Sequence, residues 1–166
     1  MAKLEVKDNK KLVLKSVICK KLHDTKVEDV DQEINRFHQH LQLLKAQIFG
    51  PLIVKSCGTT IHDDGLITTD FEFYIQAHNA QQYSNIYDVQ DSISVPYCLY
   101  VRFEDSPEYL QYAYSKLDLY VYENDIQTDG IVYENDIQTD GIVYTVYVNS
   151  SPEKMVVDIF IPIVSL

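Results

Sequence analysis

The sequence predicts an α+β fold built from two tandem βαββ modules, each an antiparallel sheet with its main helix on one face. Three observations support this prediction. Two segments, 27–49 and 106–121, have apolar residues at helical spacing. Each is preceded by one β-rich segment and followed by two. Short polar segments with turn residues separate these elements, so the order strand, helix, strand, strand occurs twice.

The first module begins with a strand and a helix. Lys11–Leu22 is β-rich and roughly alternating, which predicts a strand. Val27–Phe49 is predicted to be one helix, because its apolar residues step by three and four along a continuous stripe. Thr25 and Glu28 have the spacing of a capping box, and Gly50-Pro51 supplies a helix stop.

Two further strands complete the first module. Pro51–Cys57 and Leu66–Ala77 are β-rich, and residues 62–65 (HDDG) between them have the composition of a turn. The polar segment 78–91 that follows has the composition of a linker. The chain is therefore one domain over 1–166, with module one at about 11–77 and module two at about 92–166.

The second module repeats the same order. Ser92–Phe103 is a predicted strand, and Ser106-Pro107 has the residues of an N-cap and first helical position. One face of the helix that follows carries Leu110, Ala113, Leu117 and Val121. Ile142–Val148 and Lys154–Val164 are predicted to form a closing hairpin.

A perfect tandem duplication interrupts the second module. The sequence VYENDIQTDGI occurs at 121–131 and again, unchanged, at 132–142. Repeats under folding selection keep pattern rather than identity, so this copy is recent, whether natural or engineered. We expect one copy to form the helix exit and the other an extruded loop or short hairpin, because Thr-Asp-Gly is unfavourable inside a helix.

Charge and cysteine usage narrow the functional classes. The net charge is −11, with 14 Lys and Arg against 25 Asp and Glu, so phosphate backbones are repelled and nucleic-acid binding is not expected. No apolar run approaches a membrane span, and the first residues do not form a signal peptide. Three widely spaced cysteines without a CxxC motif indicate free thiols in a cytoplasmic protein and no metal or other cofactor.

Four stretches of the second half carry a family resemblance. They are Tyr97–Tyr100 (YCLY), Ser106–Tyr109 (SPEY), 141–147 (GIVYTVY) and 158–163 (DIFIPI). In this order they resemble a strand, a helix start, a second strand and the closing D-I-Y-I-P-I strand of GyrI-like (gyrase-inhibitor-like, AraC-type effector-binding) small-molecule-binding domains. DIFIPI is the most specific match, and the first half fits the family's other βαββ module.

The resemblance implies two modules related by pseudo-two-fold symmetry, with a ligand groove between them. It implies a non-enzymatic, stand-alone bacterial effector domain for small lipophilic ligands, cationic ones included. Val143, Thr145 and Tyr147 share one face of their strand, and the resemblance directs that face to the groove. Family members often carry an acid at the position of Thr145. Structural packing of these tyrosines is the alternative interpretation.

Two strand carboxylates are further ligand candidates. Glu72 and Asp158 occupy matching places in the two halves, each with an aromatic residue two positions on. A carboxylate beside an aromatic ring can hold a cation through charge and cation–π contact. Alternatively, both are sheet-surface acids paired with neighbouring strands. The complete set of predicted ligand-binding residues is Glu72, Tyr74, Tyr100, Thr145, Tyr147 and Asp158.

Other functions remain open at this stage. The layout also resembles uncharacterised Firmicute proteins coded near LXG-type toxins, which implies a protein-interaction module with an accessory or immunity role. A hydrolase of the same fold would require a groove carboxylate that activates water. The partner is thus a small molecule or a protein, and exposed tyrosines on edge strands are compatible with a homodimer.

Overall fold

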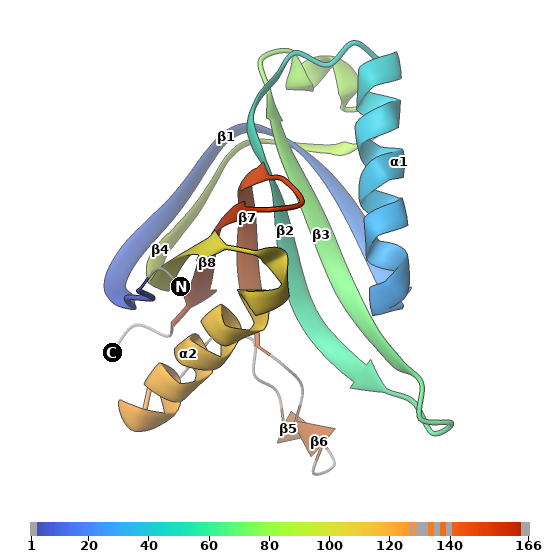
Figure 1. Cartoon of the computed structure of the whole chain (residues 1–166). Helices are drawn as coiled ribbons and strands as arrows, with labels where there is room; N and C mark the ends of the chain where they lie inside the picture. The colour runs from blue at the N-terminus through green and yellow to red at the C-terminus, as the bar shows by residue number, and fades with distance from the viewer. Residues whose placement is uncertain (1–2, 127, 129–132, 135–136, 139–140, 164–166) are drawn as a thin grey trace.

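Six antiparallel strands form one closed sheet, with two helices packed against one of its faces (Figure 1). The structure is a computed structural model that describes residues 3–126, 128, 133–134, 137–138 and 141–163. The predicted α+β class is confirmed, and the architecture is compatible with a GyrI-like fold. The strand order is β1-β3-β2-β7-β8-β4, and β4 closes the sheet by pairing with β1.

The predicted strands are present, and most are longer than expected. Their bounds are β1 Lys7–Thr25, β2 Ile48–Ile61, β3 Ile67–Ala77, β4 Asp88–Asp105, β7 Val143–Ser150 and β8 Met155–Pro162. The predicted turn at 62–65 is confirmed, since the His62 and Leu66 backbones pair across it and Gly65 has a φ of 85°. Val164, the predicted end of the last strand, lies outside the described residues.

The first long helix, α1, spans Val30–Leu43, so the predicted extension to Phe49 is wrong. The helix ends early because Lys45 adopts a left-handed φ of 59°. The Ala46 N–H then donates to the Leu41 carbonyl at 3.0 Å, which is the terminating bond of a Schellman motif. No glycine marks this end, and Gly50-Pro51 lies within β2 instead.

The start of this helix also differs from expectation. A 3-10 turn, η1, occupies Val27–Asp29, with Lys26 as its N-cap. Thr25 is the last residue of β1, and its hydroxyl lies 3.5 Å from the His23 carbonyl rather than at the helix start. The predicted capping box between Thr25 and Glu28 is therefore wrong, because the strand continues through the position that the cap would need.

The second long helix follows the prediction closely. Ser106 is the N-cap of the 3-10 turn η3, Pro107–Tyr109, and α2 continues as Leu110–Glu123. Ala113 and Leu117 are fully buried on its apolar face. Proline is favoured at this first position because its fixed φ suits a helix and its missing N–H has no helical partner.

The segment 78–91, predicted as a linker, is packed against the first half. It contains the 3-10 turn η2, Ala80–Tyr83, and the beginning of β4. Ala80 and Tyr83 are buried, and the Tyr83 hydroxyl donates to the Leu44 carbonyl at 2.7 Å. The segment therefore secures the end of α1, a role that its polar composition does not indicate.

Three apolar clusters divide the core between the two faces of the sheet. One packs α1 onto β1, β2 and β3 through Ile18, Phe37, Leu41, Leu52, Val54, Phe73 and Ile75. One packs α2 onto β4 and β8 through Leu99, Val101, Phe103, Ala113, Leu117, Val157 and Ile159. The third lies on the opposite, helix-free face and contains Leu12, Leu14, Val17, Cys19, Ile53, Tyr74, Tyr144 and Val146. The first helix thus covers β1, β2 and β3, and the second covers β4 and β8.

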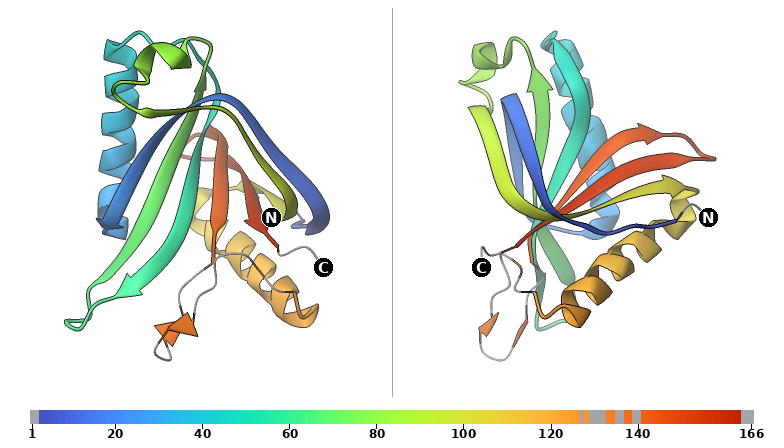
Figure 2. Two further views of the ribbon diagram at one scale, coloured as in Figure 1. Left: turned by 180° about the vertical axis from the view of Figure 1, so that it is seen from behind. Right: turned by 90° about the vertical axis from the view of Figure 1, so that its left-hand side faces the viewer.

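The described parts of the two duplicated copies have different roles. In the first copy, residues 121–123 complete α2, Ile126 packs against the α2 cluster, and Thr128 bridges to Ile163. In the second copy, β5 (Tyr133–Glu134) and β6 (Ile137–Gln138) pair with each other as a separate two-stranded sheet. Figure 2 shows this pair away from the main sheet. The expectation of one helix exit and one extruded short hairpin is confirmed for these residues.

Closure of the sheet bears on the expected homodimer. Each of the six strands pairs with two others, so none is an edge strand along its whole length. A homodimer stays a prediction. Neither described helix has the length and apolar character needed to cross a membrane.

Candidate functional site

A cavity of 540 Å³ lies between the two helices, on the helix-covered face of the sheet. The start of α1 and the middle of α2 form its walls, and strands β2, β3, β7 and β8 form its floor. Its described lining consists of Val27, Val30, Asp31, Val54, Ser56, Phe71, Tyr114, Asp118, Gly141, Val143, Thr145, Tyr147 and Ile161. We call this cavity the groove.

Strand β7 directs alternate side chains into the groove. Val143, Thr145 and Tyr147 line it, because successive residues of a strand point to opposite faces. Tyr144 and Val146, between them, belong to the cluster on the helix-free face. Thr145 pairs with Val54 of β2, so it lies where the two halves of the sheet meet.

One polar group at the groove floor, the Thr145 hydroxyl, is hydrogen-bonded to the Tyr114 hydroxyl, with the oxygens 2.8 Å apart. Burial above all, and then the nearby Tyr114 hydroxyl and Asp31 carboxylate, raise the pKa of Tyr147 to about 12. Tyr147 therefore stays neutral at physiological pH, facing a carboxylate on the opposite wall.

Two carboxylates give the groove its charge. Asp31 comes from α1 and Asp118 from α2, and no Lys or Arg is among the described lining residues. An apolar cavity bounded by negative groups favours a cation over an anion. Our reasoning from sequence missed both residues and also Tyr114. The helical spacing could have indicated them, since Tyr114 and Asp118 are four residues apart on one predicted helix and Asp31 adjoins the apolar stripe of the other.

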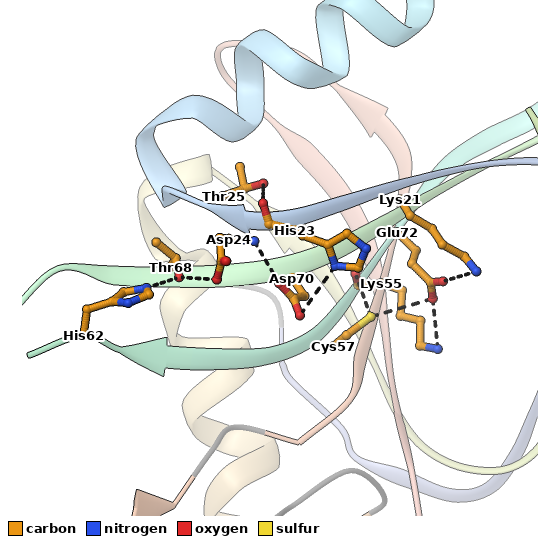
Figure 3. Close-up of polar contacts among 10 residues, drawn as sticks. All are labelled: Lys21, His23, Asp24, Thr25, Lys55, Cys57, His62, Thr68, Asp70 and Glu72. Carbon is orange, nitrogen blue, oxygen red and sulfur yellow. Dashed lines mark hydrogen bonds and ion pairs between the residues drawn. The ribbon is translucent and has the colours of Figure 1, made fainter.

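Glu72, a predicted ligand residue, lies on the helix-free face within a polar cluster (Figure 3). Its carboxylate lies 3.1 Å from the Lys55 Nζ and 3.8 Å from the Lys21 Nζ, and it accepts a 2.8 Å hydrogen bond from the Tyr74 hydroxyl. Burial alone would raise the pKa of Glu72, but these hydrogen bonds and positive charges lower it below its ordinary value. Glu72 is thus an ionised acid paired with neighbouring strands.

Asp158 has a similar environment on β8. It accepts two hydrogen bonds from Arg102, at 2.8 and 2.9 Å, and one of 2.8 Å from the Tyr100 hydroxyl. Burial, followed by this bond to Asp158, raises the pKa of Tyr100 to about 12. The Tyr100 and Phe160 rings also pack together, with centroids 5.0 Å apart. Of the two interpretations of these acids, pairing with neighbouring strands agrees with the geometry.

The structure therefore does not bring the six predicted residues together. Thr145 and Tyr147 line the groove, while the other four belong to strand-pairing networks. Those four are Glu72, Tyr74, Tyr100 and Asp158, none of which is among the described lining residues of the groove. The reason is strand alternation, because successive residues of a strand point to opposite faces of the sheet. Glu72 and Asp158 do share a face, but it is the helix-free face and not the one that the helices cover. A ligand-binding role stays a prediction for all six residues.

A second polar cluster, at the far end of β1, β2 and β3, superficially resembles a catalytic arrangement (Figure 3). His62 Nε2 lies 2.9 Å from the Thr68 hydroxyl, which donates to Asp24 at 3.2 Å. The hydroxyl proton is therefore directed to the carboxylate, and Thr68 is only 3% exposed. This geometry holds the strand ends together and does not activate a nucleophile. Among the described residues, no group of three or more His, Cys, Asp or Glu could hold a metal ion.

The whole fold is similar to solved structures, although no family model and no curated protein match the sequence. EcmrR, in an EcmrR–DNA complex, superposes with a TM-score of 0.61 at 13% identity, over 99% of this chain and 58% of EcmrR. A hydrolase from Listeria innocua has a TM-score of 0.52 at 8% identity, covering 98% of this chain and 92% of its own.

An uncharacterised conserved protein from Listeria innocua is also similar, with a TM-score of 0.51 at 9% identity over 94% of this chain and 93% of that protein. At such identities the likeness concerns the fold alone. This chain spans little more than half of the EcmrR chain, so the remainder of EcmrR has no counterpart in this comparison. The architecture is therefore one that these three proteins share.

Proposed function

We propose that this chain is a non-enzymatic ligand-binding domain that holds small lipophilic cations in the groove between α1 and α2. The observation that carries the proposal is the 540 Å³ cavity with an apolar floor and one carboxylate on each helical wall. Small-molecule sites are typically concave and apolar, roughly 300–1,000 Å³ in volume, with a few placed polar groups. Asp31 and Asp118 would attract the charge, and the apolar floor would accept the rest of the ligand.

The proposal includes two βαββ modules related by pseudo-two-fold symmetry, with the groove at their junction. The strand pairing supports it, because β1-β3-β2 in the first half matches β4-β8-β7 in the second. The halves meet through two equivalent pairs, β1 with β4 and β2 with β7. Glu72 on β3 and Asp158 on β8 make matching contacts to a tyrosine and a cationic side chain.

A binding role is favoured over catalysis by the chemistry of the groove. Its described lining includes the hydroxyl of Ser56 but no histidine, lysine or cysteine, so any general base there would have to be Asp31 or Asp118, the two carboxylates that we assign to cation recognition. Glu72, the carboxylate that a hydrolase mechanism would have used, is ionised and held by Lys55 and Tyr74 on the other face. The similarity to a solved hydrolase concerns the fold and does not locate a reactive group in this chain.

The structural neighbours also support an effector-like role more than the protein-interaction alternative. EcmrR, a protein seen in complex with DNA, contains a region of this fold in a longer chain. The present chain has a net charge of −11, which disfavours direct contact with nucleic acid. We infer that it acts on its partners through the bound ligand.

Titration calorimetry with tetraphenylphosphonium, a compact lipophilic cation, tests the proposal. The parent chain is expected to bind it, and Asp31→Asn and Asp118→Asn are each expected to weaken binding about fivefold. That factor corresponds to the ~1 kcal/mol of a partly exposed ion pair. Thermal unfolding of each variant, without ligand, establishes that its fold is intact.

Asp63→Asn is the matched control, because it removes the same charge from an exposed turn that does not line the groove. Its affinity should equal that of the parent chain. Binding that none of the three substitutions changes would place the cation elsewhere. No detectable heat of binding to the folded parent chain would overturn the proposed function.

A further inference from the structure

A second cavity, of 800 Å³, adjoins the groove along α1. Its described lining consists of Asp31, Ile34, Asn35, His38, Ile48, Gly50, Pro51, Leu52, Ile75, Pro107, Tyr147, Ser151, Pro152 and Met155. Two of these residues, Asp31 and Tyr147, also line the groove. The two cavities are therefore adjacent, with Tyr147 from the sheet and Asp31 from the first turn of α1 at their boundary.

The walls of the second cavity are mainly apolar. Leu52 and Ile75 are buried beneath it, and Ile34, Ile48 and Met155 contribute further hydrocarbon surface. No Lys or Arg is among its described lining residues. Unlike the groove, it has its only described carboxylate at the junction, since Asp31 is the one Asp or Glu in its lining. The one described carboxylate thus lies at one end of a mainly apolar cavity.

We propose that the two cavities form one bipartite site for an elongated amphiphilic cation. The cationic head lies in the groove between Asp31 and Asp118, and an alkyl chain passes Tyr147 into the second cavity. This inference deepens the proposed function and rests on it. The same geometry disfavours a fatty acid bound with its carboxylate in the groove, because that carboxylate would meet Asp31 and Asp118.

The arrangement predicts a dependence of affinity on chain length. Each methylene group that leaves water and enters the second cavity should tighten binding about fourfold. A compact cation confined to the groove would gain nothing from the second cavity. The dependence of affinity on alkyl-chain length therefore shows whether the ligand occupies the second cavity.

Titration calorimetry with alkyltrimethylammonium ions carrying alkyl chains of increasing length, below their micelle concentrations, tests the inference. The dissociation constant of the parent chain should fall about fourfold for each added methylene until the cavity is filled. Decanoate, an alkyl carboxylate, should not bind. Asn35→Trp, which adds a large ring at an exposed position lining the second cavity, should abolish the gain from chain length while leaving the affinity for the shortest cation unchanged.

Gln39→Trp is the matched control, because Gln39 is an exposed α1 position that lines neither cavity. It should keep the full dependence on chain length. Binding that is independent of chain length would overturn the bipartite site and leave the proposed function standing. If affinity still depended on alkyl-chain length in Asn35→Trp, the alkyl chain would not lie in the second cavity. Both proposals would be overturned if neither tetraphenylphosphonium nor any alkylammonium ion bound. The preference for a cation would be overturned if decanoate bound as tightly as the cations.

Discussion

The Tyr114 hydroxyl on α2 is hydrogen-bonded to the Thr145 hydroxyl on β7, with the oxygens 2.8 Å apart. This bond joins the second helix to the strand at the junction of the two halves. Thr145 is 6% exposed, so its hydroxyl depends on a protein partner. The position where GyrI-like domains often carry an acid is therefore occupied by a neutral group that the protein itself satisfies, and the groove charge comes from the helices.

The Tyr114–Thr145 bond is expected to stabilise the groove floor. Tyr114→Phe and Thr145→Val should each lower the free energy of unfolding by about 1–2 kcal/mol, because each leaves the other hydroxyl buried without its partner. The double variant should lose less than the sum of the two, since neither hydroxyl then remains. Urea denaturation of the four proteins measures this coupling.

A matched control is available on the same helix. Tyr122 is 84% exposed, and Tyr122→Phe should leave the free energy of unfolding within about 0.5 kcal/mol of the parent value. Strictly additive losses at Tyr114 and Thr145 would show that the two hydroxyls do not depend on each other.

The acid stability of the protein should depend on Glu72. Its pKa is below the ordinary value of 4.5, because its hydrogen bonds and the Lys55 and Lys21 charges outweigh the effect of burial. A carboxyl whose pKa is lower in the folded state contributes stability that is fully present above its unfolded pKa. That contribution is lost as the pH falls through the folded pKa. We expect Glu72→Gln to lower the free energy of unfolding by about 1–2 kcal/mol at pH 7.

The difference in free energy of unfolding between the parent chain and Glu72→Gln should shrink as the pH falls from the ordinary pKa of 4.5 through the lower pKa of the folded state. Urea denaturation at a series of pH values between 3 and 7 checks this. Asp63→Asn, an exposed position, should follow the parent curve at every pH. If the difference in free energy of unfolding between the parent chain and Glu72→Gln stayed constant down to pH 3, the charge of Glu72 would contribute nothing to stability.

Sequence patterns predicted the order of the elements because most boundaries here are set locally. Ser106-Pro107 marks a helix start through backbone geometry alone, and the apolar face at Ala113 and Leu117 follows from helical spacing. The end of α1 was not predictable in this way. It depends on a left-handed Lys45, where a glycine would be the usual signal, and on the pairing of Ile48 with Ala77.

The candidate site was predictable only in part for a similar reason. Strand alternation predicts that Thr145 and Tyr147 share a face, whereas placing Glu72 and Asp158 requires knowing which face the helices cover. That choice is made by packing between segments distant in sequence. Asp31 lies on the groove only because α1 packs against β2 and β3, and local patterns carry no information on that contact.

The three free thiols should react slowly in the folded protein. Burial raises the pKa of Cys19 to about 12 and the pKa values of Cys57 and Cys98 to about 11. At pH 8 the reactive thiolate is then on the order of one part in a thousand or less. Ellman's reagent should detect almost no thiol within minutes in the native chain and three in guanidinium chloride. Immediate reaction of one equivalent, absent in Cys57→Ser, would show that Cys57 is activated.

Removal of the second duplicated copy should leave the fold intact. The described strands of this copy, β5 and β6, pair only with each other, while the first copy supplies the α2 exit and the Thr128 bridge. Deleting residues 132–142 roughly halves the connection from α2 to β7, which lowers the entropic cost of closing it by about 0.6 kcal/mol or slightly more. The thermal midpoint should therefore be unchanged or higher by roughly 1–3 °C, measured by calorimetry.

Replacement of residues 132–140 by a Gly/Ser segment of equal length, which keeps Gly141 of the groove and the packed Ile142, separates the effect of length from that of sequence. If β5 and β6 contribute no stability to the main sheet, this variant should unfold at the parent midpoint, and tetraphenylphosphonium affinity should be the same in all three proteins. A lower midpoint in both variants would show that the second copy packs on the domain. A lower midpoint in the deletion alone would mean that one copy is too short to connect α2 to β7, and the duplication would then be needed for the fold.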